Sequence, residues 1–265
     1  MRTILLSLLI FSVSCSSVPL TGRKQFVAIP SSQMMSLSQE SYNQVLQENK
    51  LSTNTNYVNM VKSVGKKMSV AVEQYLVENN MKASAEGFEW QYNVIVSDQL
   101  NAWCMPGGQI AFYEGIMPVC EDEAGVAVVM GHEIAHAVAK HGNERMSQQL
   151  LIQMGGVALS EAMKNEKEQT MQLAMLAFGV GTTLGVQLPY SRTHEREADE
   201  LGLYFMALAG YDPRTAPIFW QRMDAKGGER PPEFLSTHPD PSNRIKDIEK
   251  NIPKALEYYN QKDIN

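Results

Sequence analysis

The amino-acid sequence predicts a mostly helical α+β fold in which a small β-sheet lies beside one long, apolar helix. Apolar side chains recur at helical spacing along most of the 265 residues, whereas only residues 88–96 and 109–113 have the pattern of strands. With 44% hydrophobic and 20% charged residues, the chain can bury a sizeable core. We therefore expect one large domain, preceded by an N-terminal extension.

The N-terminal extension has the features of an export signal. A positively charged start is followed by a short apolar stretch over residues 4–13 and by a small residue before Cys15. A cysteine at this place is similar to the bacterial lipoprotein signal, in which the new N-terminal Cys carries a lipid. We expect a signal peptide over residues 1–14 and a lipidated, membrane-anchored tether over residues 15–30. Ordinary cleavage with a free thiol at Cys15 is the alternative.

Composition restricts the partners and leaves the redox state of two cysteines open. The net charge of −6 and the lack of any run of Lys and Arg argue against a nucleic-acid partner. An exported protein meets an oxidising compartment, where Cys104 and Cys120 can form one disulfide. Two unpaired, half-buried thiols are the alternative, because spacing alone does not decide geometry.

Two amphipathic helices and two strands are expected before the central helix. The first helix begins at Ser31 or Ser32, and the second covers about residues 56–77. The first strand places five apolar side chains on one face: Phe88, Trp90, Tyr92, Val94 and Val96. The link over residues 101–108 is rich in turn formers. Such a sheet gives an extended peptide an edge to pair with as an added strand; a plain hairpin that supports the central helix is the alternative.

The central helix is expected over residues 121–142, with Asp122 as its N-cap and Gly142 as the left-handed residue that ends it. After it, residues 144–164 and 168–188 are predicted to be helical. The second of these stretches is rich in Met, Leu, Ala and Gly. Its glutamines and threonines make it a poor membrane span, so we expect an apolar element that covers the active site.

The central helix carries the pattern His132-Glu133-Ile134-Ala135-His136. Residues four apart lie on one face of a helix, so His132 and His136 can bind the same metal ion. Glu133 is rotated off that face. It can take a proton from a water in the open position of the metal, which is the general-base role in a zinc peptidase.

A third metal ligand has to come from another part of the chain, since catalytic zinc usually takes three protein ligands. One zinc-peptidase class continues the pattern with Gly and His, but Ala139 and Gly142 stand at those positions here. His141 lies one residue before the position at which that class carries its third histidine. We expect it to be a histidine at the C-terminal end of the helix, where it favours the negative end of the helix dipole.

Carboxylates that follow Pro189 supply the missing donor. Glu195 and Asp199 are four residues apart and share a helix face. If Glu195 binds the metal, Asp199 can accept the second ring N–H of a ligand histidine and so fix its tautomer. Glu197 is expected to be a surface charge. The residues by themselves leave Glu195, Glu197 and Glu200 open as the third ligand.

These patterns together resemble metallopeptidase family forty-eight, which includes the CAAX prenyl protease, HtpX and the mitochondrial Oma-type proteases. The resemblance rests on the central motif, on Ser191-Arg192 and on Glu195 with Asp199. Three further motifs are similar to a bacterial, periplasmic lipoprotein branch of the family: Thr21-Gly22-Arg23-Lys24-Gln25, Asn101-Ala102 with Pro106-Gly107-Gly108, and Ser236-Thr237-His238-Pro239.

The resemblance implies a zincin-like fold over residues 31–265 with one Zn²⁺ per chain. It assigns the zinc ligands as His132, His136 and Glu195 and the base as Glu133. It also implies a lipoprotein of the bacterial cell envelope that faces the periplasm, on the outer membrane rather than the inner one.

His238 lies before Asp240-Pro241, the expected start of a last helix. It can donate to the oxyanion of the tetrahedral intermediate, with Arg244 assisting, or in this family it can fill the open zinc position in a latent state. A loop histidine without catalytic work is the alternative. Asn101 and Ala102 are further candidates for contact with the substrate or the oxyanion.

The predicted function is a zinc-dependent endopeptidase that cleaves extended or misfolded envelope proteins. An edge strand forms hydrogen bonds with the backbone of an extended peptide, and the backbone of an intact folded protein is not available for such pairing. The alternative is a largely latent, chaperone-like assembly factor of the envelope that uses the same zinc site.

Overall fold

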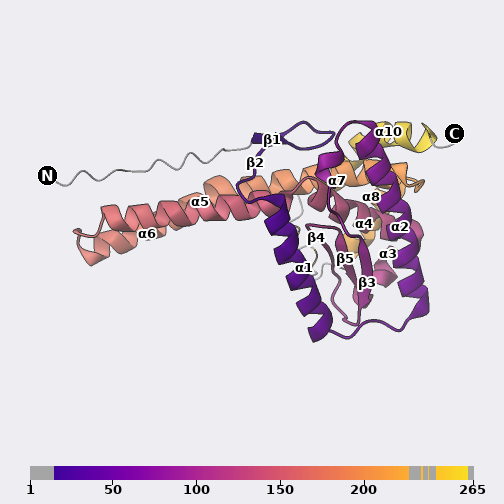
Figure 1. Cartoon of the computed structure of the whole chain (residues 1–265), viewed down its shortest axis with the longest axis horizontal. Helices are drawn as coiled ribbons and strands as arrows, with labels where there is room; N and C mark the ends of the chain where they lie inside the picture. Colours follow the sequence, from indigo (N-terminus) through magenta and orange to yellow (C-terminus); the bar gives the residue numbers. More distant parts are fainter. Residues whose placement is uncertain (1–14, 227–233, 235–237, 239–242, 262–265) are drawn as a thin grey trace.

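A computed structural model describes residues 15–226, Phe234, His238 and residues 243–261. It confirms the predicted class, since helices surround one small sheet (Figure 1). The chain begins with an antiparallel ribbon of β1 (Cys15–Ser17) and β2 (Lys24–Phe26). Helices α1 (Ser31–Glu48) and α2 (Thr55–Glu78) follow, and the side chain of Asn54 caps the second.

The sheet contains one more strand than the sequence predicted. Strands β3 (Gln91–Ile95) and β5 (Gln109–Tyr113) are parallel, and β4 (Ala102–Met105) pairs antiparallel with β5 at the sheet edge. The link expected as a loop is therefore partly a strand, and the sheet is not a plain hairpin. Val96, which was expected on the apolar face of the first strand, lies beyond β3 and is exposed.

The central helix is shorter than predicted. After the short α3 (Met117–Cys120), Asp122 caps α4 (Glu123–Val138) by accepting a hydrogen bond from the N–H of Gly125. All residues from Gly125 to Val138 are buried. Lys140, with φ 56°, is the left-handed residue that ends the helix. Gly142 was expected in that role, but it lies inside the next helix.

Helices α5 (His141–Ala162) and α6 (Glu168–Thr182) form a hairpin that projects from the body of the molecule (Figure 1). A π-helical turn (Thr183–Gln187) joins α6 to α7 (Leu188–Leu208). The hairpin points away from the body, so the prediction that this apolar stretch covers the active site is wrong.

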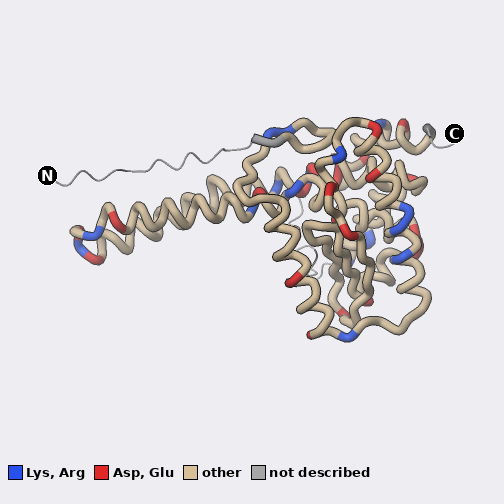
Figure 2. Tube along the Cα trace, viewed as in Figure 1, with Lys and Arg blue, Asp and Glu red and all other residues tan. Residues whose placement is uncertain are grey.

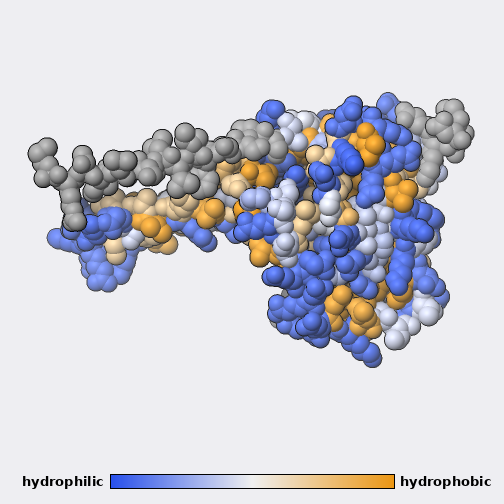
Figure 3. Space-filling view, in the orientation of Figure 1, coloured by the Kyte–Doolittle hydropathy of each residue, from blue (hydrophilic) through white to orange (hydrophobic). Residues whose placement is uncertain are grey.

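The shaft of the hairpin is apolar and uncharged. Residues 146–160 and 169–191 contain no Asp, Glu, Lys or Arg, and the charges gather at the tip (Figure 2). Exposed apolar side chains follow the shaft (Figure 3), and Val157 and Leu173 are 71% and 68% exposed. By length and composition, the continuous helix Glu168–Leu208 could cross a membrane.

Helices α4 and α7 cross at two glycines, and this crossing positions the site. A Cβ atom added to Gly131 would lie 2.6 Å from the carbonyl oxygen of Gly202, and one added to Gly202 would lie 2.8 Å from the backbone nitrogen of His132. Only glycine permits this approach. Because Glu195 and Asp199 precede Gly202 by two turns and by one turn of α7, they face the histidines of α4.

Two helices complete the domain, α8 (Thr215–Ala225) and α10 (Arg244–Gln261). The expected N-cap at Asp240-Pro241 lies outside the described residues. The N-terminal ribbon, residues 15–26, was expected as part of a tether but is packed on the domain: Val18 and Gln25 are buried, and Arg23 reaches side chains of α5 and α7.

Candidate metal centre

Four buried side chains meet in one cluster: His132 and His136 from α4, Glu195 from α7 and His238 from the segment before α10. Each offers one ligand atom, and these atoms lie within 4.8 Å of one another. The three ligands that the family resemblance implied are thus together. His238 joins them, with Nδ1 3.3 Å from His132 Nε2 and 3.2 Å from a carboxylate oxygen of Glu195.

His132 is supported by a carboxylate. Its Nδ1 lies 2.9 Å from Asp199 Oδ1, and since a carboxylate only accepts hydrogen bonds, His132 donates here. Asp199 therefore stands where the sequence placed it, behind a ligand histidine. Arg244 donates from Nε to the other oxygen of Asp199 and from Nη2 to Glu195, and its guanidinium lies over the Trp220 ring. Arg244 is thus directed at the acidic pair, and its expected contact with the oxyanion stays a prediction.

His136 is supported by a second histidine that the sequence analysis assigned wrongly. Its Nδ1 lies 2.8 Å from His141 Nδ1, and His141 Nε2 lies 2.9 Å from Glu197 Oε2. His141 is completely buried at the start of α5 and is not the last residue of α4. Glu197, expected as a surface charge, is 6% exposed.

Arg23 from the N-terminal ribbon joins two acidic residues behind the cluster. It donates from Nε to Glu197 over 2.8 Å and from Nη1 and Nη2 to the two oxygens of Glu144. Glu144 also lies 2.9 Å from His194 Nε2, and the His194 ring stacks on His141 with a centroid distance of 4.2 Å. All five histidines of the chain therefore belong to one buried assembly.

Glu133 lies beside the cluster and is free to work as a base. Its Oε1 is buried, has no hydrogen-bond partner within the described residues and lies 3.5 Å from His238 Nε2. Burial raises the pKa of the Glu133 carboxyl, although His238, His132 and the backbone N–H of Cys104 lower it in part. Strand β4, which contains Cys104, therefore passes close to the base.

The electrostatics of the cluster fit a cation. Burial lowers the pKa of His136 to about 3, so this imidazole is neutral, as metal ligation requires. Burial also opposes charge on His132, but Asp199 and Glu195 outweigh it and raise its pKa to about 9. Two carboxylates thus attract positive charge to this place. Two imidazoles and a carboxylate are the ligand set of a catalytic metal site.

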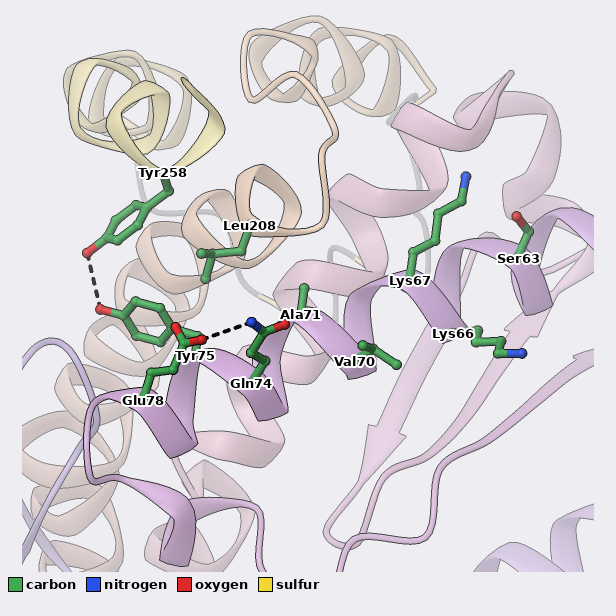
Figure 4. A pocket seen from close by; sticks show the side chains of 10 residues that line it. All are labelled: Ser63, Lys66, Lys67, Val70, Ala71, Gln74, Tyr75, Glu78, Leu208 and Tyr258. Carbon is green, nitrogen blue, oxygen red and sulfur yellow. Dashed lines mark hydrogen bonds between the residues drawn. The ribbon is translucent and has the colours of Figure 1, made fainter. Parts of the chain in front are cut away.

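The cluster has little open space around it. The cavity beside His132 has a volume of only 10 Å³, and the ring of His238 stacks on Phe234 with a centroid distance of 4.6 Å. A larger hollow of 820 Å³ lies over α2, between Lys66 and Tyr258 (Figure 4). Its lining contains none of the metal-site residues.

The remaining predicted site residues have local roles. Asn101 accepts a hydrogen bond from the N–H of Ala102 at the start of β4, and the expected contact of these two residues with the substrate or the oxyanion stays a prediction. Cys104 and Cys120 are free thiols, so the alternative of two unpaired cysteines describes the structure. Cys104 lies near Glu133, whereas the Cys120 carbonyl lies against Gly125, about 12 Å away along α4. A disulfide does not bridge such a separation.

The chain matches the profile of Peptidase family M48 over residues 64–252. It is 30% identical over 240 residues to the "Mitochondrial metalloendopeptidase OMA1" of Schizosaccharomyces pombe, which covers 90% of this chain and 66% of that protein. Identity to the human "Metalloendopeptidase OMA1, mitochondrial" is 30% over 250 residues, covering 90% and 46%. The "Beta-barrel assembly-enhancing protease" of Escherichia coli is 28% identical over 167 residues, covering 60% and 33%. The chain thus spans about a third to two thirds of these curated relatives.

These relatives correct the predicted location. Six of the similar proteins, from fungi, a plant and vertebrates, are named as mitochondrial metalloendopeptidases. The prediction of a periplasm-facing lipoprotein in a bacterial envelope is therefore wrong. The structure describes the backbone of Cys15 in β1 but not its side chain, so a lipid at Cys15 stays a prediction.

Proposed function

Because the chain belongs to peptidase family M48, we propose that it is a zinc-dependent endopeptidase that cuts extended or misfolded polypeptides in protein quality control. The observation that carries this proposal is the buried cluster of His132, His136 and Glu195 with the carboxylate of Glu133 beside it. Zinc bound by these three residues would supply the Lewis acid that polarises the scissile carbonyl and the attacking water.

Glu133 performs the proton transfers. Its carboxylate takes a proton from the attacking water and delivers it to the leaving amine. The raised pKa of this buried carboxyl suits a group that has to accept a proton and release it again. Meanwhile Asp199 and Arg244 hold His132 and Glu195 in fixed orientations, so the reacting groups need not reorganise.

The proposed substrates are extended segments, and strand β4 supports this choice. One edge of β4 pairs with β5, and within the described residues no strand pairs with its other edge. A polypeptide added along that edge passes Glu133, because Cys104 of β4 is a neighbour of this carboxylate. Backbone pairing of this kind requires an unfolded stretch of substrate.

His238 favours a second candidate, a largely latent, chaperone-like protein with the same metal site. The His238 ring lies among the three proposed ligands, where a fourth protein ligand would exclude water. A catalytic zinc site keeps one position open, whereas a site with four protein ligands is closed. The two candidates therefore differ in whether His238 leaves the cluster under working conditions.

The test measures zinc content and casein cleavage for the purified chain, for Glu133→Gln and for His238→Ala. We expect one zinc per chain in the unmodified protein and in Glu133→Gln, with cleavage reduced at least 1000-fold in Glu133→Gln, on the order of what loss of an essential base costs. Faster cleavage by His238→Ala would identify His238 as a latch, and slower cleavage would identify it as an oxyanion donor. Zinc without cleavage in any variant would support the latent candidate, and absence of zinc would refute both.

A further inference from the structure

The two histidines of α4 that face the cluster are held in different ways. His132 donates directly to the carboxylate of Asp199. His136 has no carboxylate at Nδ1; it meets another imidazole, that of His141, over 2.8 Å. The proposed zinc chemistry does not by itself assign any work to His141, to Glu197 behind it or to Arg23 of the N-terminal ribbon.

We propose that His141 is a positioning residue for the metal ligand His136, and that Glu197 and Arg23 hold His141 in this role. The inference rests on the metal site of the proposed function and extends it to the N-terminal ribbon. The ribbon thereby contributes to metal affinity, although it begins more than a hundred residues before the first ligand.

If His136 binds the metal through Nε2, its hydrogen bond with His141 can have only one direction of donation. His136 Nε2 faces the cluster, 3.1 Å from His132 Nε2 and 3.5 Å from Glu195 Oε1, so its lone pair is needed for the metal. A neutral imidazole carries one ring proton, which must then be on His136 Nδ1. His141 Nδ1 has to accept that proton, so the ring proton of His141 is on Nε2. There it meets Glu197 Oε2 at 2.9 Å, and a carboxylate is an obligate acceptor.

Glu197 fixes this arrangement because both of its side-chain oxygens accept hydrogen bonds. Besides the bond from His141, it accepts from Arg23 Nε over 2.8 Å and from the hydroxyl of Thr21. A buried carboxylate without a cation would be costly, and Arg23 supplies the cation beside Glu197. The opposite tautomer of His141 would direct a lone pair at Glu197 and a proton at His136, and the lone pair of His136 would then point away from the metal.

The structure contains a matched control for packing. His194 is stacked on His141, is buried to a similar extent and binds Glu144, the other carboxylate held by Arg23. The two imidazoles thus share their burial, their stacking and the same arginine. They differ because His141 also contacts His136, whereas the hydrogen bond of His194 leads to Glu144.

The experiment compares zinc affinity, by competition with a chromogenic chelator, in the full chain and in His141→Phe, His194→Phe and His141→Asn. Loss of an outer partner of a metal ligand typically weakens binding by about 10- to 100-fold, so we expect this loss in His141→Phe. We expect less than about 3-fold in His194→Phe, and partial recovery in His141→Asn, whose amide oxygen can accept the His136 proton. In ¹⁵N-histidine spectra of the zinc-loaded protein, the Nδ1 proton of His136 should be hydrogen-bonded, and this signal should be lost only in His141→Phe.

Three outcomes separate the possibilities. Equal loss of zinc affinity in His141→Phe and His194→Phe would overturn the proposal and leave both rings as packing. Unchanged affinity in a folded His141→Phe would also overturn it, while zinc binding by the unmodified chain would leave the proposed function intact. If His141→Phe does not fold by circular dichroism, Glu197→Gln replaces it. This variant keeps the shape but not the charge, and zinc affinity equal to that of Glu144→Gln would refute the proposal.

Discussion

The two ends of the continuous helix Glu168–Leu208 differ in burial and in charge. At its core end, Gly202 lies against the backbone of α4, and every residue from Leu201 to Ala207 is buried. At its other end the helix continues into the hairpin, where no residue from 148 to 193 is buried. The core end holds charged groups with nearly no exposure, whereas the hairpin shaft has no charged groups and exposes its apolar side chains.

This difference shows which part of the chain sets the geometry of the site. Metal ligands have to be held within a fraction of an ångström, and the glycine crossing supplies close packing between the two helices that carry them. Between residues 148 and 193 the hairpin has no buried residue, so this part of it does not fix the positions of the ligands. The same kind of substitution should therefore have opposite effects in the two regions.

The largest effect is expected for Gly202→Ala. The new Cβ would lie 2.8 Å from the backbone nitrogen of His132, so α4 and α7 would have to separate. Overpacking against backbone costs about 3 kcal/mol or more, and the separation also moves Glu195 away from the histidines. We expect a lower midpoint in urea unfolding together with loss of zinc. A variant with unchanged stability and zinc content would show that the helices are not in contact at this point.

The sequence alone predicted those features of this core that depend on helix capping and helix periodicity. Asp122 as N-cap, the shared face of His132 and His136, and the pairing of Glu195 with Asp199 all depend on residues a few positions apart. The helix end at Lys140 was missed because a nearby glycine looked like the better left-handed residue.

The support behind His136 was missed for a different reason. His141 and Glu197 are 56 positions apart, and Arg23 and Glu197 are 174 apart, so neither periodicity nor spacing connects them. One signal was nevertheless present. All five histidines lie between residues 132 and 238, a stretch that also contains the motif helix and the acidic residues of α7. A chain that concentrates its histidines in this way suggests that those outside the motif also belong to the site.

A smaller effect is expected where the hairpin leaves the core, at Glu144. Burial by itself raises the pKa of this carboxyl, but hydrogen bonds from His194 and Arg23 lower it from 4.5 to about 2. A carboxyl whose pKa is lower in the folded state stabilises the protein above pH 4.5, and this contribution is lost as the pH falls toward 2. We expect about 2–3 kcal/mol at pH 6 and roughly half of it at pH 3.

Urea unfolding between pH 6 and pH 3 checks this expectation against Glu144→Gln. The free energy of unfolding of the variant should lack this part of the pH dependence, so the two curves should converge in acid. Parallel curves over the whole range would show that the charge of Glu144 is not what anchors Arg23.

The smallest effect is expected for Gly179→Ala in the hairpin, and its sign should be opposite to that of Gly202→Ala. A Cβ added to Gly179 has no atom of the described chain within 4 Å, and glycine in a helix interior is less favourable than alanine by about 0.5–1 kcal/mol. The variant should therefore slow hydrogen exchange of the α6 amides by up to about 5-fold and leave zinc affinity and the exchange of α4 unchanged. Faster exchange in α6 would mean that the added methyl group disturbs a contact, and the face of α6 at Gly179 would then be packed against another surface in solution.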